Sequence, residues 1–317
     1  MVAAVALAGA GLAHSSPIAA STQPVGRIDT ALTDDGRTVM TSIWYPSLET
    51  GSRIPYIPAS GPTAQARIAS ISASWMHAPT AAIRMVGTKI PATEAASVAG
   101  DRLPVVVVSP GMGTPRWILS GLAADLAARG YVVVVADHTN ESPAVEFPDG
   151  GIVYGTPPTV TDEYMGQQLA TRIADMRLIL DQLPTLPIVG AHLDLDRVAL
   201  AGHSYGGTTA VQVMAKDPRV KAAMSIDGPA GWERVADVPT VDRPVLFLQL
   251  TDAWVESWSE FRGEGFEHAI IENAGHYSAT DMCQFDRSRE LCGTINPDDA
   301  ARESRTVIGS FLDHVMK

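Results

Sequence analysis

The chain has 317 residues, of which 46% are hydrophobic and 18% charged, and its formal net charge at pH 7 is −12. This composition is typical of a folded globular protein with a well-filled core. The negative charge argues against nucleic acid as a partner, because contacts with phosphates need a basic face. It also disfavours anionic ligands and anionic membrane surfaces, whereas a neutral ligand meets no such penalty.

The first residues are similar to the later part of a secretory leader. Residues 2–13 form a short apolar stretch and residues 15–21 supply small side chains suited to a cleavage site, although no basic segment precedes them. The apolar stretch is too short to span a bilayer. We therefore expect a leader over residues 1–21, a secreted protein (extracellular or periplasmic), and one domain over residues 22–317.

Strand and helix patterns alternate along the rest of the chain. Such alternation predicts an α/β fold with a mainly parallel central sheet and helices on both of its faces. The predicted strands are 38–45, 104–109, 131–137, 197–202, 221–226, 244–250 and 266–272, and the predicted helices are 117–129, 161–183, 208–216 and 300–316.

An insert, residues 51–102, precedes the first central strand and is rich in Ser, Ala and Pro. Within it Ala64, Ile68, Ile71 and Trp75 recur at helical spacing and predict one apolar helix face. This face could cover a pocket or contact lipid. Few basic residues lie opposite it, so there is no strong membrane-binding signal. We favour packing against the body of the protein.

A glycine-flanked serine, Ser204, is the strongest signal for chemistry. The sequence Gly-His-Ser-Tyr-Gly over residues 202–206 follows a predicted strand and precedes a predicted helix. This pattern is typical of the nucleophile elbow, a sharp turn that presents the serine hydroxyl above the sheet. Such a turn leaves no room for a Cβ atom at the two glycine positions. Ser204 is therefore the candidate nucleophile.

A general base must come from elsewhere in the chain. His276 lies in the loop that leaves the predicted strand 266–272, where its imidazole could reach the serine. His268 lies within that strand and His314 within the final helix, which makes both poorer candidates. His203 adjoins the serine, but neighbouring side chains diverge at such a turn, so we expect its ring to point into the scaffold. The predicted base is His276.

Two aspartates compete to orient the imidazole. Asp227 ends the predicted strand 221–226, and Asp252 follows the predicted strand 244–250. Either carboxylate could hold the required histidine tautomer and stabilise the imidazolium. Both could also simply cap the next turn. Sequence position alone does not separate them.

The loop after strand 104–109 is the candidate oxyanion hole, together with the residue after the nucleophile. The backbone N–H groups of Met112 and Tyr205 are the two expected donors. The Gly111-Met112-Gly113 sequence could also begin a dinucleotide-binding fingerprint, but Arg116 stands where that motif requires a third glycine or alanine. We therefore predict no cofactor.

These motifs together resemble the platelet-activating-factor acetylhydrolase family of α/β-hydrolases. The resemblance implies an α/β-hydrolase fold and places the acid at Asp227, which is 227 − 204 = 23 residues after the serine; related polyester hydrolases and many esterases use the position of Asp252. The family carries His-Gly at the start of the oxyanion loop, whereas this chain has Pro110 and Gly111. The resemblance rests on residues 42–46, 103–113, 136–138, 202–207 and 225–227.

Cys283 and Cys292 are the only cysteines, and they lie just beyond the predicted base. Paired thiols in an exported protein are usually oxidised, so we predict a disulfide that constrains the loop carrying the base. The two cysteines have no histidine or cysteine partners at metal-ligand spacing. No metal site is predicted.

The combined motifs predict a serine carboxylic ester hydrolase. The resemblance implies cleavage of short-acyl esters, such as acetylated or oxidised phospholipids, so the expected partner is a small-molecule or lipid ester. We expect a monomer. One alternative is a lipase or a cutinase-like polyester hydrolase with an open groove. A second alternative is a binding protein with the hydrolase fold and no catalytic activity.

Overall fold

The computed structural model describes residues 23–232, 234–263 and 265–317, so the predicted leader lies outside the described residues. Its centre is a nine-stranded sheet in the order β15-β13-β11-β10-β6-β7-β2-β1-β5. The strands from β15 to β7 are parallel to their neighbours, whereas β2 runs antiparallel to both β7 and β1. The nine strands are β1 (Val25–Asp34), β2 (Arg37–Pro46), β5 (Thr93–Glu94), β6 (Leu103–Ser109), β7 (Val132–Asp137), β10 (Leu193–His203), β11 (Val220–Ile226), β13 (Val245–Gln249) and β15 (Phe266–Ile270).

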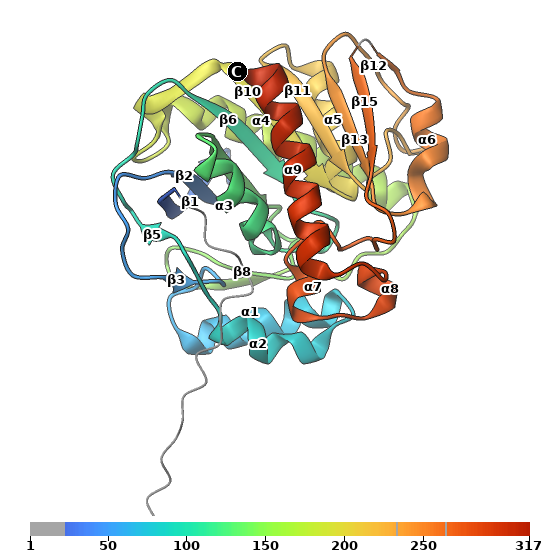
Figure 1. The fold of residues 1–317 in the computed structure, drawn as a ribbon. Helices are drawn as coiled ribbons and strands as arrows, with labels where there is room; N and C mark the ends of the chain where they lie inside the picture. The colour runs from blue at the N-terminus through green and yellow to red at the C-terminus, as the bar shows by residue number, and fades with distance from the viewer. Residues whose placement is uncertain (1–22, 233, 264) are drawn as a thin grey trace, which may run out of the picture.

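Helices cover both faces of this sheet, as predicted (Figure 1). Helices α3 and α9 pack on one face and α4 and α5 on the other. Six short strands pair outside the main sheet: β3 (Ile54–Pro55) with β4 (Lys89–Ile90), β8 (Ala144–Glu146) with β9 (Ile152–Tyr154), and β12 (Thr240–Val241) with β14 (Arg262–Gly263). The helices are α1 (Pro62–Trp75), α2 (Ala82–Gly87), α3 (Ser120–Ala128), α4 (Asp162–Gln182), α5 (Tyr205–Lys216), α6 (Val255–Ser259), α7 (Met282–Phe285), α8 (Arg289–Cys292) and α9 (Pro297–Met316).

The central strands are apolar on both sides because both of their faces are buried. Every residue of β6 and β7 is buried. Side chains of Val106 and Val108 belong to the core under α3 and α9, whereas Val105 and Val107 belong to the core under α4 and α5. This alternation explains the unbroken valine runs at the centre of the sheet.

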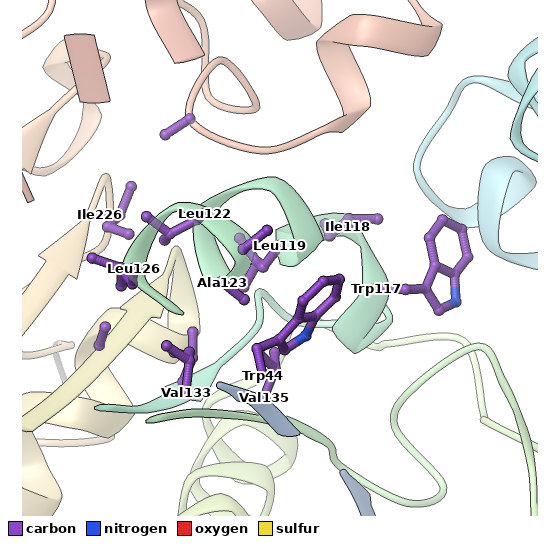
Figure 2. Close-up of a cluster of buried hydrophobic side chains, with 14 of the residues drawn as sticks. Trp44, Trp117, Ile118, Leu119, Leu122, Ala123, Leu126, Val133, Val135 and Ile226 are labelled. Atoms are coloured by element: carbon purple, nitrogen blue, oxygen red, sulfur yellow. The ribbon is translucent and has the colours of Figure 1, made fainter. Parts of the chain in front are cut away.

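Helix α3 shows how one face is closed (Figure 2). Figure 2 shows Leu122 of this helix beside Ile226 of β11, and Val133 and Val135 of β7 lie with Trp44 of β2 below the helix, all in one buried cluster with Leu126. All six side chains are nearly inaccessible to solvent. Burying a large apolar side chain stabilises the fold by roughly 1.5–3 kcal/mol, so this face contributes substantially to stability.

The chain order places a reversal point at the carboxyl ends of β6 and β10. From β6 the chain moves outward to β7 on one side, and β10 lies directly on the other side of β6. Ligands of open α/β sheets bind outside the carboxyl ends of the strands at such a reversal point. The two strands that meet there end at Ser109 and His203.

The insert 51–102 contains α1 and α2, and the predicted helix is present, but its buried face is rotated from the predicted one. Of the four predicted residues only Ile68 is buried, whereas Ala64, Ile71 and Trp75 are half-buried; the buried side is formed by Gln65, Ile68, Ala69, Ser72 and Ala73. Ile68, Ala69 and Ala73 of α1 join the main core, so the insert packs against the body of the protein. Figure 1 shows α1 and α2 at the same end of the molecule as α7 and α8.

Candidate active site

Ser204, the candidate nucleophile, lies in a sharp turn between β10 and α5. Ser204 has φ 55° and ψ −127°, a strained backbone conformation for a residue other than glycine. A Cβ atom on Gly202 would lie 2.0 Å from the carbonyl oxygen of Gly206, and one on Gly206 would lie 2.0 Å from that of Ser109. Between Ala201 and Met214, Ser204 is the single residue that is not buried. The turn therefore exposes this serine alone.

Asp227 and His276 form a hydrogen-bonded pair beside the elbow. The Nδ1 atom of His276 donates to Oδ2 of Asp227 at 2.6 Å, which leaves Nε2 unprotonated in the neutral ring. The Ser204 N–H donates to the carbonyl of Ile226, the residue before Asp227, at 2.8 Å. The three predicted side chains thus come from the carboxyl ends of β10, β11 and β15, at one edge of the sheet.

Asp227 is fully buried, yet its carboxylate is well supplied with donors. Oδ1 accepts from the N–H groups of Leu250 and Thr251, both at 2.9 Å, and Oδ2 accepts from the Thr251 hydroxyl at 2.9 Å. Burial acts to raise the pKa of Asp227, but the hydrogen bond and charge of His276, with the two backbone donors, hold this pKa below its usual value. The carboxylate is therefore kept ionised next to the imidazole.

Asp252, the competing candidate, has a different partner. Its Oδ1 atom accepts a hydrogen bond from the side chain of Gln249 at 2.8 Å, at the start of the short 3₁₀ helix Asp252–Trp254. Gln249 in turn contacts Nε2 of His268 at 2.8 Å. The His268 side chain is thereby engaged away from the elbow, on β15.

His203 is buried beneath the base, as the sequence suggested. Its Nε2 atom donates to the carbonyl oxygen of His276 at 2.7 Å, and the two rings lie 4.6 Å apart. Burial, together with the charge of His276, lowers the pKa of His203 to about 3. A neutral His203 therefore supports the loop that carries His276.

The predicted oxyanion loop lies against the elbow. A Cβ atom on Gly111 would lie 3.4 Å from Cβ of Ser204, so the peptide that leads to Met112 adjoins the nucleophile. Gly113 adopts φ +64°, and a Cβ there would touch the ring of Trp75 at 3.4 Å. The insert 51–102 thus contributes Trp75 to the rim of this loop.

Two buried charged residues that the sequence analysis missed hold this loop from below. Arg172 of α4 donates to the carbonyl oxygens of Pro110 and Gly111, at 2.8 and 3.0 Å. Glu141 pairs with Arg172 and accepts from the N–H of Gly113 at 3.3 Å. A signal was present, because Arg172 interrupts the apolar stripe of α4 at a position that should be buried.

A second serine–histidine–aspartate set lies deeper in the molecule. Ser109 contacts Nε2 of His138 at 2.8 Å, and Nδ1 of His138 contacts Asp175 at 2.9 Å. These side chains are at most 1% exposed, and Asp175 is also paired with Arg37. No substrate can reach them, so this set supports the strand end that carries the oxyanion loop.

Cys283 and Cys292 form a disulfide close to the base. The carbonyl of Cys292 accepts from the Ser278 hydroxyl at 2.9 Å, and that of Leu291 accepts from the N–H of Tyr277 at 2.9 Å. The cross-linked segment is therefore tied directly to the residues that follow His276.

Two tryptophans connect the elbow to a nearby cavity, which the charged side chains of Arg234, Asp237, Glu256 and Glu260 also line. Trp232 packs edge-on against Tyr205, with ring centroids 5.4 Å apart, and lies 5.8 Å from Trp254. Both tryptophans line a cavity of about 490 Å³. The loop before Trp232 is anchored at the site, since a Cβ on Gly228 would lie 2.0 Å from the carbonyl oxygen of Ser204. A bulky apolar group could be held here.

Among the described residues, neither a side-chain cluster suited to a metal ion nor a helix suited to a bilayer span is present. Over residues 23–232, 234–263 and 265–317, no group of three or more His, Cys, Asp or Glu side chains is placed to hold a metal ion. Within the same ranges, no helix combines the length and apolar character needed to cross a bilayer.

Comparison with known proteins agrees with this architecture. The family model described as platelet-activating factor acetylhydrolase, isoform II, matches residues 13–148. A structure of a ferulic acid esterase from Streptomyces cinnamoneus superimposes with a TM-score of 0.77 at 28% identity, covering 94% of this chain and 92% of that one.

Curated relatives match over shorter regions. A probable 1-alkyl-2-acetylglycerophosphocholine esterase from Arthroderma benhamiae is 31% identical over 128 residues, which cover 40% of this chain and 31% of the relative. A platelet-activating factor acetylhydrolase from Cavia porcellus is 25% identical over 178 residues, which cover 47% of this chain and 40% of the relative. The matches thus span less than half of either relative.

The resemblance to the platelet-activating-factor acetylhydrolases is confirmed by these matches. The model of the α/β hydrolase fold matches residues 104–277, which include the elbow, both candidate acids and the candidate base. The chain belongs to the α/β hydrolase fold family.

Proposed function

We propose that this chain is a secreted, monomeric serine hydrolase that cleaves carboxylic esters through an acyl-enzyme. The observation that carries the proposal is the hydrogen bond between His276 and the buried carboxylate of Asp227, at the same sheet edge as the strained turn at Ser204. A serine, a histidine and an ionised aspartate in this arrangement suit nucleophilic acyl transfer.

The reaction would proceed in two similar halves. His276 accepts the proton of the Ser204 hydroxyl through Nε2 as the oxygen attacks the ester carbonyl, and Asp227 stabilises the imidazolium that forms. The N–H groups of Met112 and Tyr205 bind the oxyanion. His276 then protonates the leaving alcohol, and water attacks the acyl-enzyme by the same route to release the acid.

The substrate would be a neutral ester with a short acyl chain. The family resemblance supports acetylated or oxidised phospholipids, and the net charge of −12 favours neutral over anionic groups. The disulfide supports an oxidising location outside the cytosol. Colorimetric p-nitrophenyl esters of increasing chain length would test this, since a preference for long chains would favour a lipase or polyester hydrolase instead.

A specific observation favours a second candidate substrate class, esters of aromatic acids. Trp232 and Trp254 line the cavity near the elbow, and a flat aromatic group can pack against the face or edge of such rings. The similar structure is that of a ferulic acid esterase. Comparing kcat/KM for methyl ferulate and p-nitrophenyl acetate, in the native chain and in Trp232→Ala, would separate the two classes.

The activity itself is tested by a fluorophosphonate probe, which labels only a serine that is activated. We expect labelling of the native chain at Ser204 and none in Ser204→Ala. We expect the same substitution to lower kcat by about 10⁵-fold or more. An unlabelled but folded native chain would instead indicate a binding protein without catalytic activity.

A further inference from the structure

Arg172 is a buried charged residue that contacts the candidate active site, and all of its N–H donors are engaged in hydrogen bonds. Its side chain is 1% exposed and makes five hydrogen bonds. Two go to Glu141, one to the Ser109 hydroxyl at 3.1 Å, and two to the carbonyls of Pro110 and Gly111. A guanidinium has five N–H donors, so none is left unsatisfied.

The carbonyl contact sets the direction of the neighbouring N–H group. A trans peptide is planar, and its C=O and N–H bonds point to opposite sides of the chain. The Gly111 carbonyl accepts from Nη2 of Arg172 at 3.0 Å, and it shares this interior position with the hydroxyl and the N–H of Thr114, which donate to it at 2.8 and 3.2 Å. The N–H of Met112 belongs to the same peptide and must therefore point away from Arg172.

The same guanidinium also supports the second donor. Its central carbon lies 5.4 Å from the centroid of the Tyr205 ring, in a cation–π contact. The Tyr205 hydroxyl is fixed by a 2.6 Å hydrogen bond to the carbonyl of Met165 on α4. Arg172 therefore contacts both segments whose N–H groups would bind the oxyanion.

We propose that Arg172, held by Glu141, is a positioning residue that orients the N–H groups of Met112 and Tyr205 as an oxyanion hole. This inference rests on the proposed function. It assigns a role beyond folding, because a buried ion pair contributes little net stability compared with apolar residues of similar size. The pair also compensates for the loop's Pro110, which has no N–H of its own with which to fix the loop.

The test is Arg172→Lys, which keeps the charge beside Glu141 but loses the planar fork that reaches two carbonyls. We expect kcat/KM for p-nitrophenyl acetate to fall about 10- to 100-fold, with a smaller change in KM, since removal of one oxyanion donor costs about 10²–10³ in kcat. Binding of a trifluoromethyl ketone, whose adduct carries an oxyanion, should weaken in parallel. Binding of the corresponding unreactive alkyl ether should not change.

Arg197→Lys is the matched control. Arg197 also binds one carboxylate, Asp194, and two carbonyls, those of Arg102 and Met316, but it lies near the amino end of β10, away from the elbow. We expect this variant to keep native kcat/KM and ketone affinity. An equal loss of both in the control would show that the effect is a general loss of packing and would overturn the proposal.

A second variant covers the case in which Arg172→Lys does not fold. Arg172→Gln/Glu141→Gln removes both buried charges while leaving side chains that can form hydrogen bonds, and we expect a folded protein with a similar loss of kcat/KM. Native kcat/KM in either folded variant would overturn the proposal. If neither variant folds, the pair serves the stability of the whole domain and the positioning role is likewise wrong. An inactive native chain, by contrast, would contradict the proposed function itself.

Discussion

At the scale of single residues, geometry alone does not identify a catalytic set. The buried Ser109, His138 and Asp175 repeat the hydrogen-bond pattern expected of the site. They differ in exposure: the His276 side chain is 29% exposed, whereas that of His138 is 1% exposed. A strained, accessible serine and an accessible histidine are what distinguish the candidate site, because a substrate must reach both.

Asp227 and Asp252 can be separated directly at this scale. We expect Asp227→Asn to lower kcat by about 10³–10⁴-fold, because an amide favours the wrong histidine tautomer. Asp252→Asn should stay within about twofold of the native chain, since its contact is with Gln249 and it lies in a largely exposed turn. Steady-state kinetics on p-nitrophenyl acetate measures both. Loss of turnover in the Asp252 variant alone would reverse the assignment.

At the scale of elements, the sequence predicted what depends on local patterns. Local sequence is enough to predict two features. The valine runs of β6 and β7 indicate strands buried on both faces, and the glycines around Ser204 indicate a tight turn. Helix α5 begins at Tyr205, three residues before the predicted start, because Ser204 is its N-cap. Strand β1 was not predicted, since Gly26 and Arg27 are both buried and hide the alternation of a strand.

Contacts between residues far apart in the chain could not be predicted from local sequence patterns, for a physical reason. Asp227 and Asp252 follow β11 and β13, which are adjacent parallel strands, so both carboxylates lie near one edge of the sheet. The choice depends on where the loop after β15 places His276, and no local pattern contains that information. Arg172 and Glu141 are 31 residues apart and come together only through the packing of α4 on the sheet.

The loop that carries the base depends on the disulfide, which gives a prediction for this element. Replacing both cysteines by alanine should lower the free energy of unfolding by about 2–3 kcal/mol, because the closed segment is short. Loss of kcat should be modest, since His203 and Asp227 still hold His276. Urea denaturation and kinetics of the double variant, compared with the oxidised native chain, provide the measurement, and the reduced native chain is the control that should match the variant. Unchanged stability would show that the cross-link does not constrain this loop.

At the scale of the whole molecule, buried Asp175 and Asp217 are held ionised by hydrogen bonds from Arg37 and Arg219, which keep the pKa of each carboxyl below its usual value. Asp281 lies just after the loop that carries His276 (the base loop), and its pKa shifts in the opposite direction. The Asp281 side chain is fully buried, and burial raises its pKa to about 6. The charge of Arg305 and the hydrogen bond from the N–H of Gly121 act to lower this pKa but are outweighed. Asp281 joins α3, α9 and the base loop through these contacts.

This difference predicts how stability changes with pH. The folded state binds the Asp281 proton more tightly than the unfolded state, whose pKa is near 3.8, so this group destabilises the fold above pH 6. Lowering the pH from 7 to 4 should therefore recover about 2 kcal/mol from Asp281, whereas acids with lowered pKa values act in the opposite direction. Asp281→Asn lacks this titration.

Comparing the native chain with Asp281→Asn isolates the effect of the Asp281 carboxyl on stability. Urea unfolding of the native chain and of Asp281→Asn at pH 7 and pH 4 should show the stability difference shifting by about 2 kcal/mol in favour of the native chain at the lower pH. Contributions from all other titrating groups cancel in this difference, provided that the two folds are the same. A difference that does not change with pH would mean that Asp281 is ionised in the folded protein with an ordinary pKa, and that the junction of α3, α9 and the base loop carries a buried negative charge at neutral pH.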